Sequence, residues 1–275
     1  MNDLRVSLVQ GDTRWHDPAG NRDHYAALIA PLAGATDLVI LPETFTSGFS
    51  NDAIDQAEGM DGPTVAWMLA QARTLGAAVT GSVQLRVEDG DGATRVCNRL
   101  LWATPDGQLA HYDKRHLFRF AGEHKRYSAG SERLCVEWKG WRINPQVCYD
   151  LRFPVFCRNR FDVERPGQPD FDLQIFVANW PAARAHAWKT LLRARAIENL
   201  CWVAAVNRVG VDGNGLAYDG DSVAIDFLGQ PQVETREREQ VVTTVISAQA
   251  LAAHRERFPA MLDADVFELA APTVD

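Results

Sequence analysis

Nine short apolar runs, most of them rich in β-branched residues, recur along this chain of 275 residues, and stretches with helical patterning lie between several of them. The runs cover residues 4–10, 37–41, 77–84, 95–104, 143–149, 173–180, 201–209, 221–227 and 241–247. Helical patterning covers residues 21–32, 63–75 and 183–200. Several runs are apolar almost throughout, which is typical of strands in a sheet that is covered on both faces. The pattern predicts a layered α/β fold.

Turn-forming sequences separate several of the apolar runs. Residues 89–92 read Asp-Gly-Asp-Gly, residues 139–140 read Lys-Gly, and residues 212–215 read Asp-Gly-Asn-Gly. Such sequences predict antiparallel hairpins in addition to βα units. The polar stretch 160–172 is short enough to be a loop, and the composition does not change along the chain. We therefore expect a single domain over residues 1–275.

Charge and composition exclude several classes of function. The chain has 28 Lys and Arg against 36 Asp and Glu, a formal net charge of −8 and a pI near 5.4. This charge provides no basic surface for nucleic acid or for an anionic membrane. No run of about 18 residues is apolar and free of charge, and the N-terminus lacks the pattern of a signal peptide. We expect a cytoplasmic protein without a nucleic-acid partner or a membrane span.

The five cysteines and seven histidines do not form a metal-binding pattern. The cysteines are odd in number and never form a CxxC pair, which argues against both a disulfide framework and a zinc site. The histidines form neither HExxH nor His-x-His. We expect no metal, and we expect any important cysteine to act as a thiol.

Three polar residues at the ends of apolar runs are candidates for chemistry. Glu43 follows the run 37–41 and Pro42, where a carboxylate caps the next turn or reacts. Lys114 lies among aromatic and charged residues and, taken alone, fits a solvated charge. Cys148 lies near the end of the run 143–149, and Pro154 after it favours the first turn of a helix. Backbone N–H groups at such a junction favour a thiolate, although a lone cysteine is more often an inert core residue.

Taken together, the segments LPETFTSGF, YDKRHLF and VCYDLRFP place Glu43, Lys114 and Cys148 at spacings of 71 and 34 residues. In this order they resemble the nitrilase superfamily of carbon–nitrogen hydrolases. The resemblance continues through residues 177–181, 188–210 and 218–229, and it is greatest to the omega-amidase branch. Tyr149-Asp150 follows the cysteine, where true nitrilases usually have Trp-Glu. Val155 replaces the glutamate of the commoner CYDxRFPE pattern, so no role is transferred from that acid.

The resemblance implies an α-β-β-α sandwich that commonly dimerises through its sheet-packing helices into a larger sandwich. It also implies that Cys148 is the nucleophile, Glu43 the general base, and Lys114 the cation that holds the oxyanion with the backbone N–H of Tyr149. Glu123 resembles a second acid that many members place beside the lysine, and its alternative is a surface acid. The scheme needs no cofactor.

The branch resemblance implies a small amide substrate, such as the omega-amide 2-oxoglutaramate, whose distal carboxylate needs a cation. Trp180 is a candidate for the pocket wall or the core, and Arg195 and Glu198 are expected to form a structural pair or a solvated face. Candidate cations near the motifs are Arg119, Lys125, Arg126, Arg152 and Arg184, and the sequence does not choose among them.

The sequence leaves three alternatives open. The first is another carbon–nitrogen hydrolase that acts on a deaminated-glutathione-type amide, a nitrile or a carbamoyl compound. The second is a binding protein that kept the fold without turnover. The third is a thiol redox sensor, which the absence of a CxxC pair disfavours.

Overall fold

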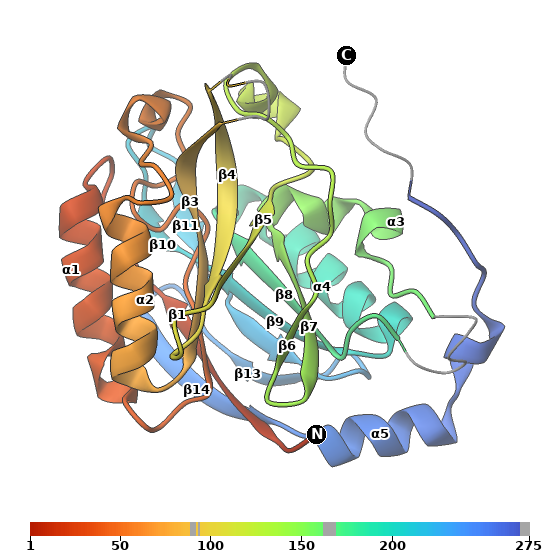
Figure 1. Cartoon of the computed structure of the whole chain (residues 1–275). Coiled ribbons are helices and arrows are strands. Elements are labelled where there is room, and N and C mark those ends of the chain that lie inside the picture. The colour runs from red at the N-terminus through yellow and green to blue at the C-terminus, as the bar shows by residue number, and fades with distance from the viewer. Residues whose placement is uncertain (89–91, 93, 162–168, 270–275) are drawn as a thin grey trace.

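The computed structural model describes residues 1–88, 92, 94–161 and 169–269 (Figure 1). Three residues of the predicted turn 89–92 and most of the predicted loop 160–172 therefore lie outside the described residues.

Two six-stranded sheets form the centre of the fold, with strand orders β14-β1-β2-β3-β4-β5 and β13-β12-β9-β8-β7-β6. The first sheet contains β1 (Leu4–Gln10), β2 (Leu38–Ile40), β3 (Ala78–Glu88), β4 (Thr94–Ala103), β5 (Leu109–Asp113) and β14 (Gln240–Ile246). The second contains β6 (Val136–Trp138), β7 (Trp141–Val147), β8 (Leu173–Ala178), β9 (Trp202–Asn207), β12 (Val223–Ile225) and β13 (Pro231–Glu234). A separate hairpin pairs β10 (Val209–Val211) with β11 (Ala217–Asp219).

Parallel and antiparallel pairs mix in both sheets, as the turn sequences predict. The pairs β1–β2, β2–β3, β7–β8 and β8–β9 are parallel, and the outer pairs are antiparallel. Lys139 and Gly140 connect β6 to β7 with φ angles of 51° and 81°, the geometry of a tight hairpin turn. Residues 212–215 form the predicted turn between β10 and β11.

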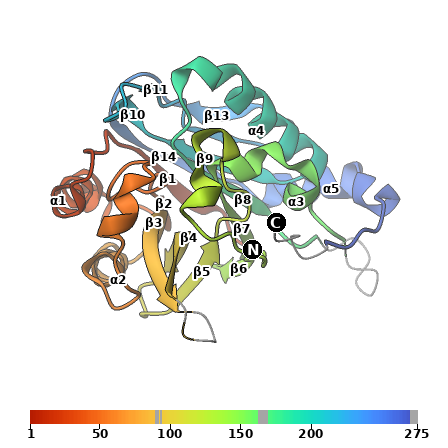
Figure 2. The same ribbon diagram turned by 90° about the horizontal axis from the view of Figure 1, so that it is seen from above.

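Helices cover the outer face of each sheet (Figure 2). Tyr25 and Met68, from the two helices on the first sheet, are buried in one cluster with its strands, and Trp188 and Leu192 are buried in another with β8 and β9. The helices are α1 (Pro18–Ile29) and α2 (Pro63–Leu75) on the first sheet, α3 (Pro154–Cys157) and α4 (Ala185–Asn199) on the second, and α5 (Ala248–Arg257) after β14. No described helix is long and apolar enough to cross a membrane.

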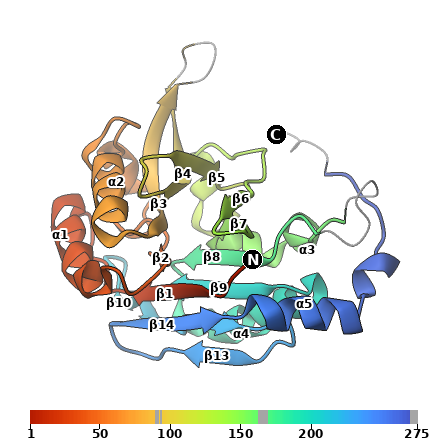
Figure 3. The same cartoon turned by 60° about the horizontal axis from the view of Figure 1, so that its bottom comes forward.

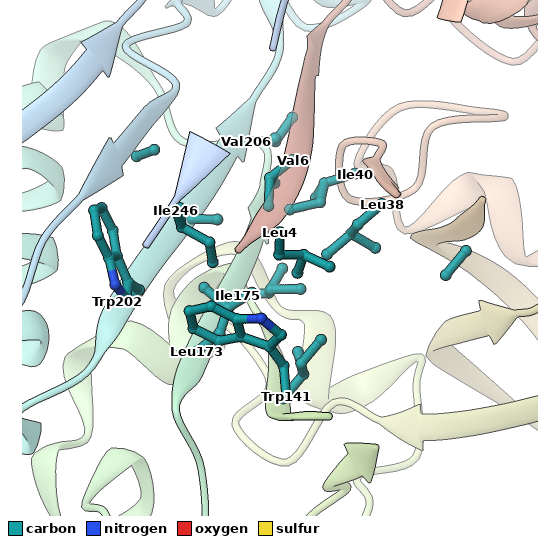
Figure 4. Packing of buried hydrophobic residues seen from close by; sticks show 14 of the residues in the cluster. Leu4, Val6, Leu38, Ile40, Trp141, Leu173, Ile175, Trp202, Val206 and Ile246 are labelled. Atoms are coloured by element: carbon teal, nitrogen blue, oxygen red, sulfur yellow. The ribbon is translucent and has the colours of Figure 1, made fainter. Parts of the chain in front are cut away.

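The main core lies between the two sheets. Leu4, Val6, Leu38 and Ile40 of the first sheet pack toward side chains of the second (Figure 4). The facing residues of the second sheet include Trp141, Leu173, Ile175, Trp202 and Val206. Successive strand residues face opposite sides of a sheet, so Val9 of β1 packs on the outer face of the first sheet, against its helices. Figure 3 shows α1 and α2 on one side of the strands and α3 and α5 on the other, and the predicted α-β-β-α sandwich is confirmed.

Some elements differ from the sequence prediction. The run 201–209 divides into β9 and β10 at Arg208, which is fully buried and forms an ion pair with Asp12. Strands β5, β6, β11 and β13 and helix α5 are not predicted from the sequence. These strands have three to five residues each, which is too short for alternation to be recognisable.

Candidate active site

Glu43, Lys114 and Cys148 meet at the carboxyl ends of strands from both sheets. Glu43 follows β2, Lys114 directly follows β5, and Cys148 directly follows β7. Since β5 runs parallel to β2 within the first sheet, the two strands end on the same side. The three side chains line one cavity of about 420 Å³. The fold therefore brings together residues that are 71 and 34 positions apart.

Lys114 lies between two buried carboxylates. Its Nζ is 2.8 Å from Glu43 Oε1 and 3.0 Å from both carboxylate oxygens of Glu123. All three side chains are at most 1% exposed. Burial lowers the pKa of Lys114, but the charges of Glu123 and Glu43 outweigh it, so the pKa lies above its ordinary value. Lys114 therefore stays cationic at neutral pH.

Glu123 is buried, unlike a surface acid in a charged loop. It opens the short 3₁₀ helix Glu123–Lys125, and its Oε2 accepts a hydrogen bond of 2.5 Å from the backbone N–H of Phe118. Burial raises the pKa of the Glu123 carboxyl, with Lys114 acting in the opposite direction.

Two asparagines hold the Glu43 carboxylate, and neither is predicted from the sequence. Asn98 donates from Nδ2 to Oε1 at 2.8 Å, and the backbone N–H of Asn179 donates to Oε2 at 2.8 Å. The Asn179 side chain also donates to the backbone carbonyl of Glu43 at 2.7 Å. An amide inside the apolar run 95–104 is the sequence signal for Asn98, and Asn179 lies in the VANWP motif.

Cys148 occupies a strained position between β7 and the 3₁₀ helix Cys148–Arg152. Its φ angle is 45°, in the left-handed region that is uncommon for residues other than glycine. Asp150 fixes this junction: its Oδ2 accepts from Val147 N at 3.0 Å and from the Tyr112 hydroxyl at 2.8 Å. The Cys148 thiol lies 3.8 Å from the carbonyl oxygen of Asn179, to which it donates. The strain at Cys148 thus accompanies a side chain turned into the cavity.

The surroundings of the Cys148 thiol act mainly against its ionisation. Burial raises the pKa of its thiol well above the ordinary value, and the charge of Glu43 raises it further, while Lys114 lowers it. Pro154 begins a helix as predicted, but α3 has only four residues, too few for a substantial dipole. The thiol is therefore protonated at rest and needs a base when it reacts.

Two of the five candidate cations line the cavity. The guanidinium of Arg152 lies 4.9 Å from the ring centre of Trp180, and that of Arg184 lies 5.3 Å from the ring centre of Phe118. Neither guanidinium forms an ion pair or a hydrogen bond with any described residue. The other three candidates are exposed and do not line the cavity: Arg119, Lys125 and Arg126.

The remaining predicted residues have clear positions. Tyr149 and Trp180 line the cavity, and Trp180 is only 4% exposed, so it belongs to both the wall and the core. Arg195 and Glu198 form a structural pair at 2.7 Å, away from the cavity. Within the described residues, no group of three His, Cys, Asp or Glu is arranged to hold a metal ion.

Comparison with known proteins gives the same family from sequence and from structure. The family model for carbon-nitrogen hydrolase matches residues 5–256. The chain is 46% identical to "Omega-amidase YafV" of Yersinia enterocolitica, covering 98% of this chain and 100% of that protein. It is 33% identical to "2-oxoglutaramate amidase" of Bacillus subtilis, with 94% and 96% covered.

Among solved structures, the chain is 80% identical to XC1258 from Xanthomonas campestris, a CN-hydrolase superfamily protein with an arsenic adduct in its active site. The TM-score is 0.95, with 98% of this chain and 100% of that chain covered. Nit3 of Saccharomyces cerevisiae is 21% identical with a TM-score of 0.81 over 94% and 95% of the two chains, which supports the fold alone. The sequence motifs, the sandwich and these matches agree that the chain belongs to the carbon–nitrogen hydrolase family, the nitrilase superfamily.

Proposed function

We propose that the protein is an omega-amidase, which hydrolyses the terminal amide of a small dicarboxylate monoamide such as 2-oxoglutaramate. One observation carries this substrate class: the cavity that contains Cys148 also contains two guanidinium groups without a carboxylate partner among the described residues. A substrate with an amide at one end and a carboxylate at the other complements this arrangement. The names of the relatives support the same substrate class.

In the proposed acylation, Glu43 takes the thiol proton of Cys148 as sulfur attacks the amide carbon. The carbonyl oxygen becomes an oxyanion, which the ammonium of Lys114 and the backbone N–H of Tyr149 stabilise. Tyr149 is the second residue of a 3₁₀ helix, where the first N–H groups have no partner within the helix. Glu43 then gives its proton to the nitrogen and the C–N bond breaks. Ammonia leaves, and the acyl group remains on Cys148 as a thioester.

In the proposed deacylation, a water molecule attacks the thioester and gives a proton to Glu43. The C–S bond breaks, the proton returns to sulfur, and the product is a dicarboxylic acid. Glu123 contributes by holding Lys114 in place and keeping it charged. The reaction consumes one water and releases one ammonia without a cofactor.

The substrate carboxylate would bind Arg152 or Arg184. Each guanidinium is held against an aromatic ring, which restricts its motion and leaves its N–H groups available to a planar carboxylate. A cavity of about 420 Å³ suits a small molecule rather than a protein chain. We therefore propose a small-molecule amide as the partner.

We also propose a cytoplasmic homodimer of single-domain subunits. The dimer rests on the family resemblance. The cytoplasmic location is supported by the five cysteines, all of which are free thiols.

The test compares amide hydrolysis with and without the distal carboxylate. Ammonia release would be measured for 2-oxoglutaramate, succinamate and butyramide, together with nitriles and carbamoyl compounds. We expect kcat/KM for the carboxylate-bearing amides to exceed that for butyramide by about a hundredfold or more, because butyramide has no carboxylate to pair with a cavity guanidinium. Equal efficiencies, or a preference for a nitrile or carbamoyl substrate, would remove the omega-amidase assignment.

A set of arginine variants identifies the receiving cation. Arg152→Met and Arg184→Met remove the charge inside the cavity, and Arg119→Met removes one outside it. We expect at least one cavity variant to lose most of the preference over butyramide while hydrolysing butyramide at the original rate. Arg119→Met should behave like the unmodified protein. Retention of the full preference in both cavity variants would contradict this assignment.

A further inference from the structure

Asn98, in the middle of β4, contacts every charged member of the buried Glu43–Lys114–Glu123 cluster. Its side-chain Nδ2 is 2.8 Å from Glu43 Oε1 and 3.4 Å from Glu123 Oε1. Its backbone carbonyl accepts a 3.0 Å hydrogen bond from the backbone N–H of Lys114. Asn98 is 1% exposed and is not part of the cavity wall. Asn98 therefore contacts the cluster on the side away from the cavity and does not reach a substrate.

The orientation of the Asn98 amide is unfavourable for stability alone. Its Oδ1 is buried, and none of the described residues donates a hydrogen bond to it. A buried carbonyl oxygen without a donor destabilises the fold. Asn159 is equally buried and has the opposite arrangement, since its Oδ1 accepts from Phe171 N at 3.2 Å and its Nδ2 donates to Phe171 O at 2.9 Å. Asn159 is therefore a structural asparagine with which Asn98 can be compared.

The charge balance of the cluster explains what the amide contributes. Two carboxylates share one ammonium, so Glu43 and Glu123 together carry one negative charge more than Lys114 neutralises. A neutral donor stabilises this excess charge without adding a second cation. Because Asn98 holds Oε1 and Asn179 N holds Oε2, the plane of the Glu43 carboxylate is fixed from both sides.

We propose that Asn98 is a positioning residue for the general base: it orients the Glu43 carboxylate for proton transfer from Cys148, at the expense of its own unpaired Oδ1. The proposal rests on the proposed function, because it assigns the proton transfer to Glu43. The titratable groups that face Glu43 are Lys114, Glu123, Cys148 and Tyr127. All four remain in the variants below.

Asn98→Asp keeps the shape of the side chain, removes the N–H donor and adds a negative charge. At pH 8 we expect kcat for the best amide substrate to fall on the order of a hundredfold, the scale of general-base catalysis, while KM changes less than about threefold. The introduced carboxyl regains a donor when it is protonated, so the defect relative to the unmodified protein should shrink toward pH 6. Asn98→Leu has no titratable group, and its defect should not depend on pH.

Alkylation of Cys148 by iodoacetamide tests the same point without any assumption about the substrate. The sulfur forms a C–S bond, iodide leaves, and the thiol proton passes to Glu43 and then to water. Intact-protein mass spectrometry at pH 7.5, followed by peptide mapping, gives the rate at Cys148. We expect Asn98→Asp and Asn98→Leu to react about tenfold more slowly than the unmodified protein, approaching Glu43→Gln.

Asn159→Asp is the matched control, because it makes the same chemical change at an equally buried asparagine away from the cavity. It should lower Tm and leave kcat, the pH profile and the alkylation rate unchanged. The proposal is overturned if the Asn98 variants likewise have a lower Tm but an unchanged kcat, pH profile and alkylation rate. If the unmodified protein alkylates at Cys148 but hydrolyses no amide in the panel, the proposed function fails, and the alkylation rates still decide the role of Asn98.

Discussion

Glu43 carries the largest share of the proposed chemistry at the scale of single residues. The same carboxylate receives the thiol proton, delivers it to ammonia and later activates water. Its contacts fit this use, since Asn98, Lys114 and Asn179 hold it while the thiol of Cys148 stays protonated at rest.

Glu43→Gln removes the base without changing the side-chain shape. Acylation and thioester hydrolysis should both slow by about 10²- to 10⁴-fold, because each half-reaction needs the proton shuttle. Single-turnover kinetics with a rapid quench separates the two steps. Unchanged rates in both steps would exclude Glu43 as the base, and a defect in one step alone would restrict its role to that step.

Lys114→Met removes the proposed oxyanion donor and should lower kcat by about 10²- to 10³-fold. The raised pKa of Lys114 gives a second expectation for the unmodified protein. A lysine whose pKa lies above its ordinary value of 10.5 keeps its charge through pH 10, so kcat/KM should not fall between pH 8 and pH 10 through loss of this proton. A decline centred near pH 9 that is absent from Lys114→Met would contradict the assignment.

The sequence predicts the charged and nucleophilic residues of the site better than the residues that hold them. Motifs reveal Glu43, Lys114 and Cys148 because their order and spacing are specific. Asn98 is marked only as an amide inside an apolar run, and Asp150 lies in the cysteine motif without an indication of its role, because both act through contacts with residues far away in the chain. The left-handed φ angle of Cys148 is equally invisible, because no glycine marks the turn.

At the scale of elements, Asp172 ties the amino ends of three parallel strands to α5. Its carboxylate accepts hydrogen bonds from the guanidinium groups of Arg142, at the start of β7, and Arg255, in α5. Its backbone carbonyl accepts from Trp202 N, where β9 begins. The carboxylate is 3% exposed, and although burial acts to raise its pKa, Arg142 and Arg255 bring it below the ordinary value.

Asp172→Asn should lower the free energy of unfolding by about 3 kcal/mol at pH 7, because it leaves two arginines without their anion. A carboxyl whose folded pKa is depressed stabilises the fold above its unfolded pKa, and this contribution disappears as the pH falls through the folded value. The difference in the free energy of unfolding between the variant and the unmodified protein should therefore be largest at neutral pH and decrease below about pH 4. Denaturant unfolding across this pH range measures the difference. A difference that grows as the pH falls would contradict a stabilising role of the Asp172 carboxylate.

Helices and strands can be predicted from the sequence where their burial requires a recognisable pattern of apolar residues. Strand β8 is apolar except for Gln174, because one face meets the other sheet and the other face meets helices or their flanking residues. Strand β1 instead alternates apolar residues that face the other sheet with polar residues such as Arg5 and Ser7. Helix α5 has Leu251 as its main buried anchor among charged and alanine residues, so its sequence has little amphipathic signal. The edge strands β6 and β13 have only three and four residues, so their alternation is too short to identify a strand.

At the scale of the whole molecule, the core between the sheets connects both halves of the chain. Leu4 and Ile40 pack in the same cluster as Leu173 and Trp202, so neither sheet has a complete core without the other. We predict a single cooperative unfolding transition for the 1–275 unit, with agreement between calorimetric and van't Hoff enthalpies. Two separated transitions would indicate independent domains instead.

The proposed dimer is tested by sedimentation at micromolar concentration. We expect a species of twice the monomer mass of 30.5 kDa. A monomer across the concentration range would remove the dimer and leave the chemistry of the cavity unaffected.

We propose that Cys148, alone among the five cysteines, forms a thioester with the substrate. Intact-protein mass spectrometry after rapid acid quench with 2-oxoglutaramate or succinamate, followed by peptide mapping, tests it most directly. We expect an acyl adduct on Cys148 that accumulates in the first turnover, and we expect Cys148→Ala to show neither this adduct nor ammonia release. An adduct on Cys97, Cys135, Cys157 or Cys201, or near-normal turnover by Cys148→Ala, would contradict the assignment of Cys148 as the nucleophile.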